Sequence, residues 1–388
     1  MKRTLENRLG YTYLSLMLSS KICRSLVALL LGIVAYAVIS FAIALWRSPY
    51  SIAVLIASAY EGGLIGDENP GLAADWYLSA AKKGDRVAQY KLGFILYYGR
   101  GVDVDRAKGL RWIRESADYG NADAQYFMGV ASIAGVDVPA DLSGAATWFR
   151  KAAEQGHAKA QRLLASLYHK GIGIEASGHE AFKWAGKAAA QGDAEALTLL
   201  GTLYFLGEGV PADPERAVEL LTQAAAFGDT AAYEMLGAAS LHGTGTPKNI
   251  PAALRWYTRA AEQGRVNAQF VLGYLHSSGG EVALDYSLAN RWLLKAAVQG
   301  NAVALVMLAA HLDNGQGIKR DKLKACGLVR VALKQALPPD IEGPMRKQLD
   351  REEKTLSPEQ LIEVSALEML YSSPEGLNGL QEDLNSFL

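Results

Sequence analysis

The sequence predicts an all-α protein, an α-solenoid (superhelix) of about eight 36-residue helical hairpins, preceded by one transmembrane helix and closed by C-terminal capping helices. Three observations predict this fold: residues that recur every 36 positions, an uncharged stretch from Ser25 to Trp46, and the loss of the recurring pattern after Leu337. Half of the 388 residues are apolar, which suits closely packed helices. The expected parts are a cytoplasmic segment at 1–24, the transmembrane helix at 25–46, the solenoid at 50–337, the capping helices at 338–371 and a mobile tail at 372–388.

The stretch from Ser25 to Trp46 is expected to cross a membrane. Its 22 residues carry no charge, and as a helix they would cover about 33 Å, enough to cross a hydrocarbon core. Basic residues cluster before it, whereas Arg47 alone follows closely, so the positive-inside rule keeps the N-terminus cytoplasmic and the repeats periplasmic. A cleaved signal peptide is the alternative, because Ala42 and Ala44 offer a small-x-small site, but the apolar run is longer than such peptides use. We therefore expect a single-pass protein of the inner (cell) membrane.

Glycine, alanine and tryptophan recur at a fixed step of 36 residues. One alanine series runs from Ala88 to Ala304 without a break, and one glycine series comprises Gly84, Gly120, Gly156, Gly192, Gly228, Gly264 and Gly300. The tryptophans share one position of the repeat, at Trp76, Trp112, Trp148, Trp184, Trp256 and Trp292, and Leu220 fills the missing place. A constant period of this length is the sequence signature of a repeat architecture.

Each repeat is expected to be a hairpin of two helices. In the repeat at 86–121, a first helix near 86–98 meets the turn at 99–101, and a second near 106–119 ends at Gly120. Each helix carries one apolar stripe, which a lone hairpin could not bury, so the hairpins must stack into a solenoid. The tryptophan position, such as Trp112, is expected to fill the space between successive hairpins.

The pattern changes at the C-terminal end. Leu328 takes the tryptophan position, Ala336 stands where glycine belongs, and Pro338 and Pro339 then end the helix. Two capping helices are expected near 341–354 and 358–371, the second beginning with a capping box at Ser357. The tail beyond them is expected to be mobile until its leucines, Leu377, Leu380 and Leu384, pack on the cap.

The repeats resemble a known family. The segment AEALTLLGTLYFLGEGVPADPERAVELLTQAAAFGD, at 194–229, and the endings AAEQG, AAAQG and AAVQG are similar to Sel1-like repeats, relatives of the tetratricopeptide repeats. The resemblance covers residues 50–337. It implies an adaptor or assembly scaffold, often an exported one in bacteria.

Neither a catalytic nor a metal-binding motif is present in the sequence. The six histidines form no H-E-x-x-H pair and no Cys/His cluster, and no phosphate-binding loop or nucleophile elbow occurs. Cys326 falls at a position that is otherwise mostly apolar, where a buried thiol is expected to be inert. With a formal net charge of −1 the chain has no basic field for nucleic acid. We therefore expect no enzyme activity, no cofactor, no metal and no nucleic-acid partner.

The candidate partner-binding residues lie on one face of the first helices. Positions equivalent to Tyr90, Phe94 and Tyr97 vary most between repeats, and a spacing of four and then three residues places each trio on one helical face. In tetratricopeptide-like solenoids this face lines the groove. The predicted site comprises Tyr90, Phe94, Tyr97, Tyr126, Val130, Ile133, Phe270 and Tyr274. For the polar trios of the middle repeats, a groove and a solvated or merely inter-repeat face remain equal alternatives.

These expectations combine into a function. The chain is expected to be a membrane-anchored periplasmic scaffold that binds other proteins through this face, in an envelope assembly or a polysaccharide-export machine. Its partner is expected to be membrane-associated or periplasmic, because almost no linker separates Trp46 from the first repeat. The alternative is a periplasmic binder or modifier of glycan or cell-wall material, which the aromatic side chains would suit.

Overall fold

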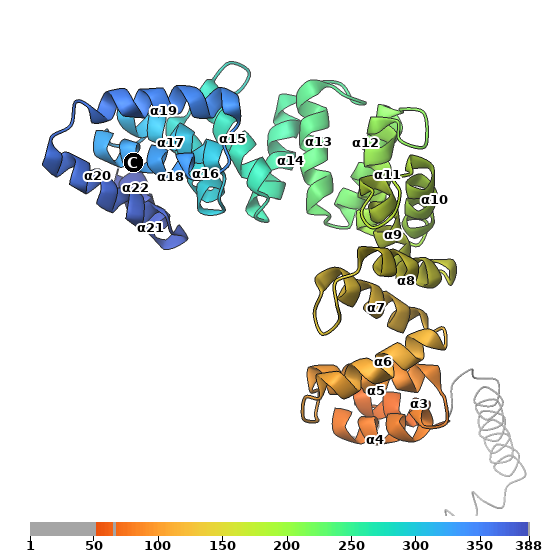
Figure 1. The fold of residues 1–388 in the computed structure, drawn as a ribbon. Helices are drawn as coiled ribbons and strands as arrows, with labels where there is room; N and C mark the ends of the chain where they lie inside the picture. Colours follow the sequence, from red (N-terminus) through yellow and green to blue (C-terminus); the bar gives the residue numbers. More distant parts are fainter. Residues whose placement is uncertain (1–51, 65–66, 387–388) are drawn as a thin grey trace, which may run out of the picture. The chain divides into compact units, whose positions relative to one another are not determined.

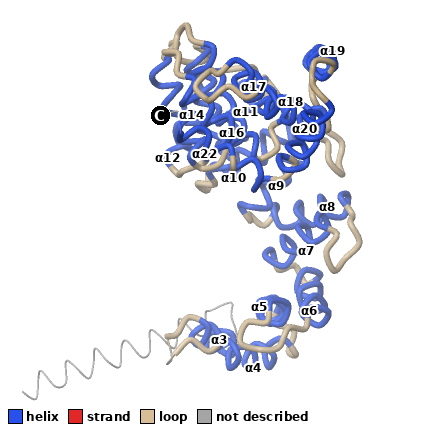
Figure 2. Tube along the Cα trace, turned by 90° about the vertical axis from the view of Figure 1, so that its left-hand side faces the viewer, coloured by secondary structure: helices blue, strands red, loops and turns tan. Residues whose placement is uncertain are grey.

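The computed structural model describes residues 52–64 and 67–386, and Figures 1 and 2 show that this part of the chain consists of helices and loops. The described residues form two compact units, one ending at Asp141 and the other beginning at Leu142. The predicted transmembrane helix lies outside the described residues, and none of the helices within them is long and apolar enough to cross a membrane.

Most successive helices pack on one another within each unit. The N-terminal unit contains α3 (Ile52–Glu61), α4 (Pro70–Ala81), α5 (Arg86–Tyr98), α6 (Arg106–Asp118) and α7 (Ala122–Ala134). The C-terminal unit contains α8 (Leu142–Glu154), α9 (Ala158–Lys170), α10 (Gly178–Ala189), α11 (Ala194–Leu206), α12 (Pro214–Ala226), α13 (Thr230–His242), α14 (Ile250–Glu262), α15 (Val266–Ser278), α16 (Tyr286–Val298), α17 (Ala302–Asn314), α18 (Lys322–Leu333), α19 (Pro339–Glu353), α20 (Pro358–Tyr371), α21 (Pro374–Asn378) and α22 (Leu380–Ser386). The all-helical repeat solenoid predicted from the sequence is confirmed.

Recurring caps determine where these helices begin and end. Asp85 accepts hydrogen bonds from the backbone N–H groups of Val87 and Ala88 at the start of α5, and Gly99 ends that helix in the left-handed conformation. Asp105 caps α6 in the same way. Such caps satisfy backbone groups that a helix terminus otherwise leaves without partners. The hairpin predicted at 86–98 and 106–119 is therefore found within one residue of its expected bounds.

The deep core position is the residue that follows the tryptophan. Phe149 and Leu221 are fully buried at this position, whereas Trp148 is half-buried and Trp76 is 41% exposed. Trp184 is buried, and Trp112 packs partly buried against a core cluster from α3, α4 and α5, so the tryptophans contribute to packing between hairpins from the border of the core and not from its centre. Successive side chains of an α-helix differ by about 100° around its axis. The side chain after the tryptophan therefore points into the core, while the indole lies at the border between core and solvent. There Lys151 lies over the Trp148 ring, with Nζ 4.5 Å from its centroid.

Small residues and glutamines connect the helices within this core. A Cβ atom at Gly93 would lie 2.7 Å from the carbonyl oxygen of Gly109, so the close approach of α5 and α6 requires glycine. The buried Gln161 donates from Nε2 to the carbonyl oxygen of Ala153 at 3.0 Å, and Gln269 donates to that of Ala261 in the same way. Each glutamine satisfies a carbonyl near the C-terminus of the preceding helix. These bonds connect α9 and α15 to the hairpins that precede them.

The last helices cover the end of the array. The capping box at Ser357 forms as predicted, and α20 packs on α18. Residues 374–386 form the short helices α21 and α22, and the three leucines of this segment pack on a surface, as expected from the sequence. Leu377, Leu380 and Leu384 are buried in a core cluster that also contains Leu293. Their burial stabilises the tail because apolar surface is removed from water.

Candidate functional site

An aromatic ladder runs along α5 in the N-terminal unit. Tyr90, Phe94 and Tyr98 are four residues apart, which places them on one helical face. The ring centroids of Tyr90 and Phe94 lie 6.0 Å apart, and those of Phe94 and Tyr98 lie 4.6 Å apart. Tyr98 is 53% exposed, while Tyr90 and Phe94 are half-buried. The three rings thus contact one another along the helix, and each still has surface that a partner could contact.

Charged and hydroxyl groups border this ladder. The guanidinium of Arg100 lies over the Phe94 ring, 5.0 Å from its centroid. Burial raises the pKa of Tyr90 to about 12, with smaller contributions from Asp123, Tyr98 and Tyr126. The Tyr90 hydroxyl therefore stays protonated at neutral pH and can donate a hydrogen bond.

Tyr97 plays a different part from the one its position in the sequence indicated. Its side chain is buried, and its hydroxyl donates to Oδ2 of Asp137 at 2.6 Å, which raises its pKa. Arg106 lies 3.7 Å from the same carboxylate and stacks over the Tyr97 ring. Asp137 has a φ of 59° at a turn position that glycine holds in most other repeats. Tyr97 therefore anchors this turn and offers little surface to a partner.

The remaining predicted residues of the N-terminal unit lie on α7. Val130 and Ile133 are each 40% exposed, and Tyr126 is half-buried. Phe127 meets Tyr97 edge to face, at 5.3 Å between ring centroids. We define the aromatic face as Tyr90, Phe94, Tyr98, Tyr126, Val130 and Ile133. Among these, Tyr98 is not one of the eight residues of the predicted site, although its i+4 spacing from Phe94 is a signal that the sequence contains.

The polar trios of the middle repeats line a cavity in the C-terminal unit. This cavity, of about 290 Å³, lies along α9, α11 and α13 and is lined by Arg162, Ser166, His169, Lys170, Glu195, Thr198, Leu199, Thr202, Asp229 and Ala231. Arg162 forms ion pairs with Asp193 and Glu195, and His169 Nδ1 lies 2.7 Å from Glu208 Oε2. The charges around the cavity are largely paired with one another. The ion pairs of Arg162 and His169 join neighbouring repeats, as the inter-repeat alternative expects, and the hollow beside them has the shape that the groove alternative expects.

A second, more apolar cavity lies beside the first. It has a volume of about 200 Å³ and is lined by Phe205, Met235, Ala238, Ala239, His242 and Thr244. Thr202, which lines the polar cavity, contacts Met235 with Oγ1 3.5 Å from Sδ. Farther along the same unit, Tyr274 of α15 is 51% exposed and its ring lies 6.4 Å from that of Phe270. The structure thus places Phe270 and Tyr274 in a different unit from the aromatic face.

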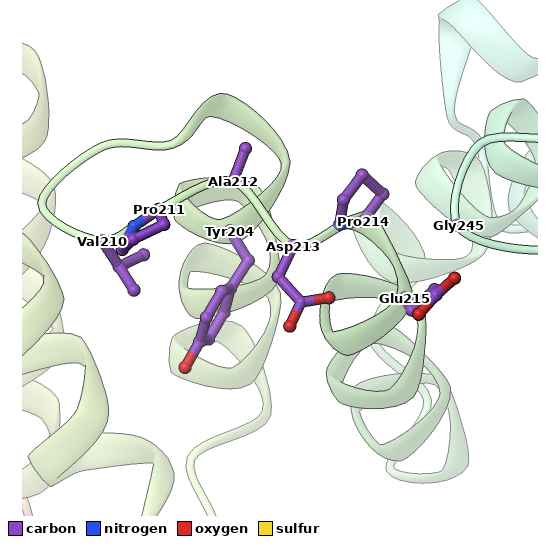
Figure 3. Close-up of a pocket in the computed structure, with 8 residues that line it drawn as sticks. All are labelled: Tyr204, Val210, Pro211, Ala212, Asp213, Pro214, Glu215 and Gly245. Atoms are coloured by element: carbon purple, nitrogen blue, oxygen red, sulfur yellow. The ribbon is translucent and has the colours of Figure 1, made fainter.

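Another hollow lies at the loops that lead into α12. Figure 3 shows its lining residues around the turn at 210–214. The hollow has a volume of about 630 Å³. Asp213, the central carboxylate in this view, caps α12 by accepting from the backbone N–H of Arg216 at 2.9 Å. Its role in starting a helix explains its presence there.

The described residues hold no group of three or more His, Cys, Asp or Glu side chains arranged to bind a metal. Cys326 is buried, and burial together with Glu352 raises its pKa to about 12. His311 is also buried, which lowers its pKa to about 4, and its Nδ1 lies 2.6 Å from Oδ1 of Asn290. A protonated thiol is a poor nucleophile, so Cys326 is an inert core residue.

Comparison with known proteins agrees with this geometry. The Sel1 repeat family model matches eight segments of the chain, at 53–85, 86–121, 122–157, 158–193, 194–229, 230–264, 266–301 and 302–335. The chain belongs to the Sel1 repeat family. Sel1-repeat proteins generally mediate protein–protein interaction, and their fold is typically a non-catalytic scaffold. None of the curated proteins compared with the chain matches it.

Two solved structures share the fold of this Sel1-repeat protein. One is a protective antigen present in uropathogenic Escherichia coli strains, 26% identical, with a TM-score of 0.53 over 85% of this chain and 86% of that one. The other is a Sel1 repeat protein from Oxalobacter formigenes, 28% identical, with a TM-score of 0.57 over 64% of this chain and 97% of that one.

Proposed function

We propose that this Sel1-repeat protein is a non-enzymatic, membrane-anchored scaffold that holds another protein on its aromatic face. The exposure of ring surface along Tyr90, Phe94 and Tyr98 is the observation that supports this proposal most strongly. Partly exposed tyrosine and phenylalanine rings supply much of the binding energy at protein interfaces. The side chains of Val130 and Ile133, 40% exposed, extend the same surface with apolar area.

The proposed location follows from the N-terminal sequence. Residues 25–46 carry no charge, and the basic residues that precede them favour a cytoplasmic N-terminus, an inner-membrane span and periplasmic repeats. Only five residues separate Trp46 from Ile52, where α3 begins, so the aromatic face of the N-terminal unit would be held near the membrane. The partner would then be membrane-associated or periplasmic, as in an envelope assembly or a polysaccharide-export machine.

A glycan is the second candidate ligand. Sugar rings stack on aromatic side chains, and the hydroxyl group of Tyr90 can donate hydrogen bonds to sugar oxygens. The ladder on α5 offers both features. In this case the protein would bind cell-wall material directly instead of a protein.

Capture experiments with a paired variant separate these candidates. The full chain with Phe94→Ala and Tyr98→Ala should lose capture of envelope proteins at least tenfold, since two interface anchors are worth about 1–2 kcal/mol each. The matched control is Tyr119→Ala with Phe227→Ala, because these rings are 62% and 67% exposed and lie outside the aromatic face. Equal loss in both variants, or full capture by the first, would exclude the aromatic face. Capture of purified wall polymer alone would support the glycan candidate.

A further inference from the structure

The first hairpin exposes large apolar side chains. Ile52 is 64% exposed and Leu64 84% exposed, while Leu72 and Trp76 on α4 are 45% and 41% exposed. Leu72 and Trp76 are four residues apart and so share one face of α4. We refer to these four residues as the end face.

Two residues of the end face, Ile52 and Leu72, are larger or more apolar than the residues at most equivalent positions of later repeats. Ile52 stands at the position that alanine holds in every later repeat, where the side chains from Ala88 to Ala304 are fully buried. Leu72 stands where later repeats carry mostly charged or small residues, among them Lys108, Glu180, Arg216 and Lys324. A terminal repeat left in water normally needs a polar outer surface. We therefore expect the larger apolar side chains of the end face to be covered by another apolar surface.

The two ends of the array differ in this respect. At the C-terminal end, Val364 of α20 is fully buried in a cluster with Cys326 and Leu349. Arg330 of α18 further binds this cap through ion pairs with Glu353 and Glu368. Within the described residues, α3 packs on α4 and α4 on α5, and the end face remains exposed beyond them.

We propose that the end face rests on the lipid interface of the membrane. This inference depends on the proposed anchor, because the apolar stretch that ends at Trp46 precedes Ile52 by only five intervening residues. Five residues extend over at most about 18 Å, so the first hairpin cannot move far from the membrane surface. Each interfacial layer is roughly 5–8 Å thick, and tryptophan is enriched there because its ring is amphipathic. The short connection to the anchor therefore holds Trp76 and Leu72 close enough to the membrane to enter its interfacial layer, where their side chains are stable.

Fluorescence quenching by lipids can test this contact in the full-length protein. The protein is reconstituted in vesicles whose phospholipids carry bromine high on the acyl chains, which quench nearby tryptophans. Trp46 in the apolar stretch and Trp76 should both be quenched, so Trp76→Phe should lower the lipid-quenched emission about twofold. Trp112→Phe, at the same position one repeat later, is the matched control and should leave the quenched emission unchanged. Leu72→Lys should lower the quenching of Trp76 without altering its side chain.

The possible outcomes distinguish failure of the proposed lipid contact from failure of the proposed membrane anchor. The first outcome concerns protein that floats with the vesicles after an alkaline wash. If its lipid-quenched emission is the same in Trp76→Phe and wild type, the lipid contact of the end face is overturned and the anchor is retained. Protein that does not float with the vesicles overturns the anchor and the contact together. Exchange protection of residues 52–64 without lipid quenching would show that another part of the chain or a protein covers the end face, which also overturns the contact.

Discussion

At the scale of single residues, neighbours decide what each position of the repeat does. Tyr97 and Ile133 occupy equivalent positions, yet Tyr97 is buried on Asp137 while Ile133 is 40% exposed. The tryptophan and the residue after it differ in the same manner, since Phe149 is fully buried and Trp148 is only half-buried. A residue's share of the stability therefore follows from its burial and contacts, and its size alone is a poor guide.

This difference predicts the outcome of two alanine substitutions. Phe149→Ala should lower the local free energy of unfolding by about 3–5 kcal/mol, because it leaves a cavity in the core. Trp148→Ala should cost less, since its ring is partly solvated and its contact with Lys151 is worth about 0.5–1 kcal/mol. Hydrogen exchange across residues 142–193 would measure both effects. A larger loss of protection in Trp148→Ala would show that the tryptophan is the main core residue after all.

At the scale of helices and turns, two kinds of glycine support the repeat. Gly228 follows α12 with a φ of 85°, and a Cβ atom there would meet no atom within 4 Å. Gly209 has a φ of 74°, and a Cβ atom there would lie only 2.2 Å from the carbonyl oxygen of Gly178 in the preceding hairpin. The first glycine therefore serves only its own turn, whereas the second also lets two hairpins touch.

Alanine at these two glycines should have unequal effects on stability. Gly228→Ala should cost about 1–2 kcal/mol, the usual penalty for a left-handed residue. Gly209→Ala adds a clash with the backbone, so the total should reach about 2–5 kcal/mol. Denaturant unfolding of both variants, with wild type as reference, gives the comparison. Equal costs would mean that the contact between Gly209 and Gly178 relaxes without loss.

At the scale of the whole molecule, the proposed topology depends on the arrangement of charge about residues 25–46. A compartment reporter tests it best when fused behind α22, because removal of residues after 371 would also remove the buried Leu377 and Leu380. We expect activity of this fusion in the periplasm and activity of an N-terminal fusion in the cytoplasm. Cytoplasmic activity of the C-terminal fusion would contradict the orientation. Recovery of a species that begins near Leu45 would replace the anchor with a signal peptide.

The repeat fold could be predicted from the sequence because its signals are local and recur. Aspartate and asparagine caps, glycine at the turns and an apolar stripe at helical spacing are all properties of one 36-residue segment, so eight copies confirm one another. The bounds of α5, α6 and α20 followed within about one residue from these signals.

Burial and the shape of the candidate site could be decided only by tertiary structure. The sequence placed Tyr97 on a variable face, but its contact with Asp137 spans 40 residues and depends on how two hairpins meet. The polar cavity beside Thr198 likewise needs α9, α11 and α13 side by side. Periodicity determines which side chains share a helical face, whereas the distance between neighbouring helices determines which of those side chains remain exposed.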